Sequence, residues 1–191
     1  MSSNDADPIS PLRTPVVHIT THNASGKAIV HSSNDKPLAP YSDMRISHKL
    51  VYTSNGLPMD LNDEADIKAH KEAEESGNLR IVKKGGTICR IVDFAPGNKS
   101  MMHRTQSLDF GVVLSGQIVM ELDDGSKTLM KEGDVAVQRG TMHTWKNPSE
   151  TEWARLMFVL QDSKPLEIGG LRLKEDVSAG HGVFPSSGND A

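Results

Sequence analysis

The chain of 191 residues contains a single cysteine, Cys89, so no intrachain disulfide can form. Cys89 lies in the segment 87–91 (TICRI), which is typical of a strand and suggests a buried thiol, and buried thiols are usually inert. Uninterrupted apolar runs are only a few residues long, far below the roughly 20 residues that cross a bilayer. The sequence therefore excludes a disulfide-stapled domain and predicts no transmembrane helix.

Positive charge is neither abundant nor clustered, since the net charge is -4 and the pI is about 6.0. A nucleic-acid-binding surface needs grouped cations to displace counterions from phosphates, so nucleic acid is not an expected partner. Residues 1–11 are polar and acidic, and they lack the cationic and apolar regions of a secretory signal. We therefore expect a cytoplasmic protein with no membrane partner.

Several motifs that mark common chemistries are also missing. The chain has no G-x-x-x-x-G-K-[ST] phosphate loop, no G-x-G-x-x-G after a strand, no C-x-x-C pair and no G-x-S-x-G turn. Nucleotide binding, dithiol redox chemistry and serine hydrolysis are therefore not supported.

Short β-rich segments separated by turn residues make up most of the chain. Residues 16–20 and 27–30 flank a turn and predict a hairpin, and strands alternate with tight turns from residue 79 onward. Strands of this length and spacing favour an antiparallel sandwich or barrel. The sequence predicts an all-β fold in four segments. These are a disordered leader at 1–15, an N-terminal β arm with a peripheral helix at 16–78, a barrel at 79–165 and a mostly irregular tail at 166–191.

The one predicted helix covers residues 63–76, with Asn62 or Asp63 as its cap and Gly77 at its end. Its alternating acids and lysines indicate a solvated, external helix. The β arm is longer than a small barrel requires and can cover the sheet edge of a second copy. This surplus predicts a homodimer.

Two glycine-bounded motifs carry the functional signal. The first consists of Gly97, His103, Asp109 and Gly116, and the second of Gly133, Gly140, His143 and Asn147. The span between them is short enough to be a hairpin, which places both histidines and the carboxylate on neighbouring strands. Because residues two apart in a strand face the same side, His103 shares its face with Met101 and Thr105. The motifs therefore predict a reactive pocket inside the barrel.

This pattern resembles the paired motifs of the cupin superfamily, G-x5-H-x-H-x3-E-x6-G and G-x5-P-x-G-x2-H-x3-N. Thr105 stands where that family has its second histidine, Asp109 stands where it has glutamate, and residues 138–140 replace P-x-G. Residues 102–105, 109–114 and 133–145 further resemble small single-domain fungal cupins, several of which are named oxidoreductases in polyketide gene clusters. The resemblance implies a cupin-type (jelly-roll) β-barrel.

The resemblance also implies a catalytic set of His103, His143 and Asp109. The same three residues have the composition of a facial metal triad, which makes Fe, Mn, Ni or Zn a candidate cofactor. With Thr105 in place of a nitrogen ligand and the shorter Asp109 in place of glutamate, this ligand set is incomplete. The predicted substrate-binding residues are Thr105, Gln138, Arg139 and Met120.

Three functions are compatible with this site. The leading hypothesis is a tailoring enzyme with oxidoreductase chemistry on a small polyketide-like, aromatic substrate. The first alternative is a metal-free dehydratase, isomerase or decarboxylase in which the histidines act as acid and base. The second alternative is a small-molecule-binding barrel without catalysis.

Overall fold

A computed structural model of the chain describes residues 9–41, 44–77, 80–99, 101–180 and 185–189. The strands are β1 (Val17–His22), β2 (Ala28–Asn34), β3 (Ala39–Tyr41), β4 (Ile46–Asn55), β5 (Gly86–Phe94), β6 (Ser107–Ser115), β7 (Gln117–Leu122), β8 (Lys127–Lys131), β9 (Val135–Arg139), β10 (His143–Lys146), β11 (Ala154–Asp162), β12 (Leu166–Ile168) and β13 (Leu171–Leu173). The helical elements are the 3₁₀ turns η1 (Asn62–Glu64) and η2 (Ser178–Gly180) and the helix α1 (Ala65–Glu75).

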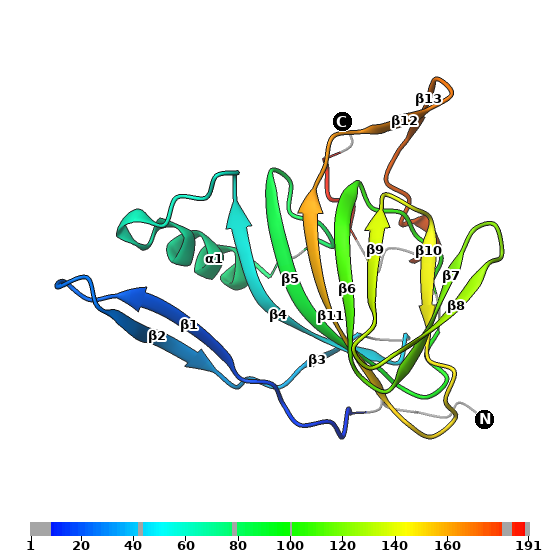
Figure 1. Cartoon of the computed structure of the whole chain (residues 1–191), viewed down its shortest axis with the longest axis horizontal. Coiled ribbons are helices and arrows are strands. Elements are labelled where there is room, and N and C mark those ends of the chain that lie inside the picture. The colour runs from blue at the N-terminus through cyan, green and yellow to red at the C-terminus, as the bar shows by residue number, and fades with distance from the viewer. Residues whose placement is uncertain (1–8, 42–43, 78–79, 100, 181–184, 190–191) are drawn as a thin grey trace.

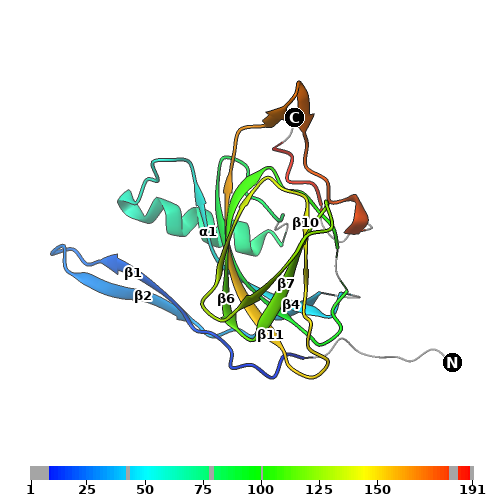
Figure 2. The ribbon, with the colours of Figure 1, turned by 45° about the vertical axis from the view of Figure 1, so that its right-hand side comes forward.

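Two antiparallel sheets build the body of the molecule. A six-stranded sheet in the order β3-β4-β5-β11-β6-β9 faces a three-stranded sheet in the order β10-β7-β8, as Figure 2 shows. The central strand β5 pairs with β4 on one side and with the much later strand β11 on the other. This crossover order is that of a jelly roll, and it confirms the predicted all-β barrel.

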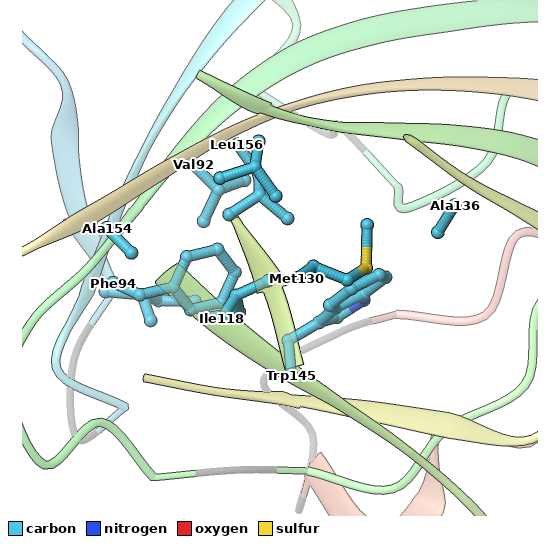
Figure 3. Packing of buried hydrophobic residues seen from close by; sticks show 10 residues of the cluster. Val92, Phe94, Ile118, Met130, Ala136, Trp145, Ala154 and Leu156 are labelled. Carbon is cyan, nitrogen blue, oxygen red and sulfur yellow. The ribbon is translucent and has the colours of Figure 1, made fainter. Parts of the chain in front are cut away.

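Side chains from both sheets pack together in the space between them (Figure 3). Ile118, Met130 and Trp145 come from the three-stranded sheet and pack against Val92, Phe94 and Leu156 of the larger sheet. Burying each such side chain is worth about 1.5–3 kcal/mol. A second, smaller cluster consists of Ile81, Val82, Ile88 and Leu160. The cavity described below is lined by members of both clusters.

Gly116 forms the corner between the two sheets. Its φ of +76° lies in the region that favours glycine, and an added Cβ would lie 2.7 Å from the backbone oxygen of Trp153. Both constraints require glycine at the turn from β6 to β7.

The N-terminal hairpin is confirmed, and it forms a separate two-stranded sheet. β1 and β2 project away from the barrel, while α1 lies beside β4 (Figure 1). No helix in the described ranges is long and apolar enough to cross a bilayer.

Three local predictions need correction. The helix begins at Ala65 rather than at residue 63, because residues 62–64 form a 3₁₀ turn and no side chain caps the helix. Residues 101–105 do not form a regular strand, since only His103 and Arg104 make isolated bridges there. Residues 1–8 of the predicted leader lie outside the described part, but residues 9–15 are held on the barrel by hydrogen bonds such as Arg155 Nη1 to the oxygen of Arg13.

Candidate active site

One cavity lies between the two sheets and contains the three predicted catalytic residues. Its walls are mainly apolar, and Val92, Trp145 and Phe158 are among them. The polar and charged side chains on its lining are Tyr41, His48, Arg90, Asn98, Lys99, His103, Asp109, His143 and Thr144. The sequence prediction that His103, His143 and Asp109 meet in the barrel therefore agrees with the structure.

The two histidines are joined as a pair through their backbones. The amide of His103 donates to the oxygen of His143 and the reverse bond is also made, each with an N–O distance of 2.9 Å. Their ring centroids are 4.4 Å apart, and the His143 ring meets the edge of Trp145 at 5.6 Å. Strand pairing thus fixes the spacing of the two rings.

The same kind of hydrogen bond orients each ring. Nδ1 of His103 lies 3.0 Å from the oxygen of Met101, and Nδ1 of His143 lies 2.9 Å from the oxygen of Thr141. A carbonyl oxygen only accepts hydrogen bonds, so each Nδ1 carries the proton and each Nε2 keeps a lone pair. The site therefore holds two imidazoles that can accept a proton.

Burial keeps both rings neutral. It lowers the pKa of His103, and burial together with the neighbouring His103 ring lowers the pKa of His143 to about 3. Desolvation disfavours the charged imidazolium, and a second positive charge at this short distance would disfavour it further.

Asp109 is a buried carboxyl group with one oxygen engaged and one free. The Thr105 hydroxyl donates to Oδ2 at 3.3 Å and itself accepts from the Ser107 hydroxyl at 2.8 Å. Oδ1 is buried and has no hydrogen-bond partner. Burial raises the pKa of Asp109 to about 6, although the hydrogen bonds from Ser107 and Thr105 act in the opposite direction. Asp109 can therefore be protonated under mildly acidic conditions and donate a proton.

Asn147, the last residue of the second motif, is part of the frame that holds the histidine strand. Its side-chain Nδ2 donates to the backbone oxygens of Phe94 and Glu152 at 3.0 and 2.7 Å. Its backbone N–H donates to Oδ1 of Asn98 at 2.8 Å. Asn98 in turn donates to the oxygen of Trp145 at 3.1 Å. These bonds tie the end of β10 to β5 across the barrel.

None of the four predicted substrate-binding residues, all of them in the described part of the chain, lines this cavity. The hydroxyl of Thr105 bonds to Asp109, and Arg139 is exposed; both residues line a separate pocket. Gln138 is buried and bonds to Thr141 and to the sulfur of Met120. Met120 packs against the core. Their roles as substrate contacts stay predictions.

The predicted metal ligands are not gathered into a complete set. The two Nε2 atoms are suitable nitrogen donors, and Asp109 has one oxygen bound by the Thr105 hydroxyl and one without a hydrogen-bond partner. Across the described ranges, no group of three or more His, Cys, Asp or Glu side chains is arranged to hold a metal ion. The residues present therefore do not fit a three-ligand centre, and a metal cofactor stays a prediction.

The sequence interpretation did not include Arg90 and His48, which also line the cavity. Arg90 lies two residues from both Ile88 and Val92 on β5, so the three side chains face the same side of the strand. The period-two pattern of the sequence therefore indicated that Arg90 points inward. His48 follows Ile46 in the same phase on β4. The sequence signal for both residues was a charged or titratable side chain on the same face of a strand as apolar neighbours.

Known proteins place this barrel in a family. The model of the Cupin domain matches residues 90–160. The chain is 44% identical over 160 residues to "Phomopsin biosynthesis cluster protein D" of Diaporthe leptostromiformis, covering 83% of this chain and 84% of that protein. It is 38% identical over 166 residues to "Oryzines biosynthesis cluster protein J" of Aspergillus oryzae, with 85% and 92% covered.

A third relative carries a class name. The chain is 36% identical over 172 residues to "Cupin-domain-containing oxidoreductase virC" of Hypocrea virens, covering 88% of this chain and 86% of that protein. The chain therefore belongs to the cupin family, within the group that includes these fungal biosynthesis-cluster proteins.

Proposed function

We propose that this protein is a tailoring enzyme of secondary metabolism that acts on a small polyketide-like, aromatic molecule bound in the cavity between the sheets. The relatives support the setting, because they are named after biosynthesis clusters. The apolar and aromatic walls around a few polar groups support a small organic substrate.

The reaction that the geometry favours is proton transfer next to a carbonyl group. The observation that carries this proposal is the pair of imidazoles with Nδ1 tied to backbone oxygens, beside a buried carboxyl group with a free oxygen. Two proton acceptors and one proton donor in a single apolar cavity match the needs of enolisation, isomerisation or dehydration.

An isomerisation illustrates the balance of protons. Nε2 of His143 accepts a proton from the carbon next to the substrate carbonyl, and protonated Asp109 gives its proton to the carbonyl oxygen, which yields an enol. Return of a proton from His143 to a different carbon, with return of the enol proton to Asp109, regenerates both groups. No external oxidant or reductant is consumed, and His103 holds the second proton-accepting position.

Oxidoreductase chemistry is the second candidate, and it is favoured by the class name of relatives such as virC. A redox step needs an electron acceptor or donor in addition to the residues of the site. The two candidates therefore differ in what must be added to the purified protein.

The substrate can be found by comparing the metabolites of a strain that lacks the gene with those of its parent. The protein is purified without chelator, and its content of Fe, Mn, Ni and Zn is measured. The compound that accumulates is then added to this protein. Turnover with less than about a tenth of an equivalent of metal and with EDTA present, and a product of unchanged oxidation state, supports proton transfer. Turnover that requires metal and dioxygen would replace it with the oxidative candidate. Unchanged turnover in His143→Ala would overturn the assignment of this site.

A further inference from the structure

Arg90 is a buried cation that has no carboxylate partner in the described part of the chain. It lies on β5, is 8% exposed and lines the cavity. The ion pairs formed by the described residues are Lys36–Glu74, Lys127–Glu121 and Arg155–Asp93. Removing a charge from water costs several kcal/mol unless another group compensates it.

The contacts of Arg90 leave part of its guanidinium unused. Nη2 donates to the backbone oxygens of Arg80 at 2.5 Å and of Ile81 at 3.4 Å, whereas Nε is buried and has no partner. Burial lowers the pKa of Arg90 to about 10, so the group is still a cation at neutral pH. Two neutral carbonyl oxygens orient the side chain but do not neutralise it.

The other buried arginine of the sheet provides a direct comparison. Arg155 faces the opposite side of the six-stranded sheet, and its Nε and Nη2 donate to the two oxygens of Asp93 at 2.6 and 2.7 Å. Arg155 therefore has the bidentate carboxylate contact that Arg90 lacks. The fold pairs one of these arginines internally and directs the other to the cavity.

The charged side chains on the cavity lining include more cations than carboxyl groups. Arg90 and Lys99 are its cations, and Asp109 is the only carboxyl group on its lining among the described residues. Asp109 belongs to β6, which is separated from β5 by β11, so the two strands lie about 10 Å apart. Two titratable rings lie near Arg90, and both are neutral at pH 7. Burial, together with the charge of Arg90, lowers the pKa of His48 to about 4, and burial raises the pKa of Tyr41. A negative charge is therefore missing at the Arg90 end.

We propose that the guanidinium of Arg90 binds the carboxylate of the ligand, so that the protein acts on a small carboxylic acid. The cavity volume of about 110 Å³ is of the same order as the roughly 150 Å³ cavity that takes up one benzene ring. The enclosed part of the ligand is thus about one ring. A carboxylate at Arg90 would direct the rest of that ring toward His103, His143 and Asp109. As a statement about the substrate, this inference rests on the proposed function.

Binding of a probe tests the inference without turnover. We expect benzoate to bind the wild-type protein at pH 7.5 at least tenfold more tightly than benzamide, its neutral analogue, in isothermal titration calorimetry. Arg90→Met should abolish this preference, while Lys131→Gln, which removes an exposed cation on β8, should preserve it. Equal binding of benzoate and benzamide, or an unchanged preference in Arg90→Met, would overturn the inference.

Two further measurements keep the test decisive. If Arg90→Met does not fold, a crystal structure of the wild-type protein with benzoate replaces it, and we expect a carboxylate oxygen about 2.7–2.9 Å from a guanidinium nitrogen of Arg90. A benzoate bound away from Arg90 contradicts the inference. His143→Ala separates this inference from the proposed function, because it should lose turnover and keep benzoate binding. Unchanged turnover in that variant with Arg90-dependent benzoate binding would reject the proposed function alone.

Discussion

His103 and His143 exchange both of their backbone hydrogen bonds, at 2.9 Å each, which holds their rings side by side in one cavity. The rings therefore act as a unit whose spacing is set by the strand pairing. His143→Ala should lower turnover of the substrate about 10²- to 10⁴-fold, the range expected when a general acid or base is removed. The measurement is kcat/KM at constant pH.

The matched control for this substitution is His31→Ala, because His31 is exposed on β2. It should keep wild-type turnover. Circular dichroism and the thermal midpoint of both variants confirm that they fold. A His143→Ala protein with wild-type kcat/KM would contradict the role of the pair.

The pH dependence of the reaction follows from Asp109 and His143. Asp109 must be protonated to donate, and its pKa is raised to about 6, so activity should decline tenfold per pH unit above about pH 6. His143 must be neutral to accept a proton, and its pKa is lowered to about 3, so protonation should reduce activity only near that pH. A profile of kcat/KM between pH 4 and 9 tests this. An alkaline limb that persists in the residual activity of Asp109→Asn would assign it to another group.

Asp109 should also make the stability of the protein depend on pH. Its pKa in the folded protein, about 6, is above the ordinary value of 3.8, so its stabilising contribution is complete below pH 3.8 and is lost as the pH rises through about 6. Two pKa units correspond to about 3 kcal/mol. Between pH 4 and pH 7, the stability of Asp109→Asn should therefore increase by on the order of 2–3 kcal/mol relative to wild type.

Urea denaturation at the two pH values measures this difference. Asp123→Asn is the control, because Asp123 is exposed in the turn after β7. Its stability relative to wild type should change little between pH 4 and pH 7. If the stability of Asp109→Asn relative to wild type also changes little between the two pH values, the pKa of Asp109 is not raised in the folded protein.

The sequence alone predicted the scaffold of this site better than its electrostatics. His143, Asn147 and the turn glycine Gly116 were found because their spacing reflects hairpin geometry, which is local in the chain. Arg90 was not singled out, because the sequence does not show that the fold leaves its guanidinium without a carboxylate partner. Gln138 was predicted to bind the substrate, but its buried contact with Met120 arises from the packing of β9 against the other sheet. Such contacts between distant strands are not visible in a local pattern.

Asp93 and Arg155 form a buried, bidentate ion pair that also anchors the start of the described chain. Asp93 is fully buried, its Oδ2 accepts from the Ser10 hydroxyl at 2.5 Å, and Arg155 Nη1 donates to the oxygen of Arg13 at 2.7 Å. Asp93→Asn leaves Arg155 as an uncompensated buried charge, so the free energy of unfolding should decrease by about 3–5 kcal/mol.

The double variant Asp93→Leu/Arg155→Met distinguishes charge from packing. It removes both charges, so urea denaturation should show a smaller loss of stability than for Asp93→Asn. Both variants should release residues 9–15, which makes the peptide bond after Arg13 more sensitive to trypsin. If the double variant is less stable than Asp93→Asn, the stabilising effect of these two side chains is not limited to neutralising each other's charge.

The hairpin of β1 and β2 leads to the last prediction. It forms its own two-stranded sheet, and Ile29 and Val30 on β2 are 43% and 60% exposed. An isolated two-stranded hairpin is at best marginally stable in water, so this arm needs a surface to pack on. We propose that the surface belongs to a second copy of the chain, whose edge strand β9 exposes Val135 and Val137, at 55% each. Light scattering should then give twice the monomer mass of 20.8 kDa, and Val30→Lys should shift the mass toward 20.8 kDa. A wild-type mass of 20.8 kDa would show that the arm has no partner copy.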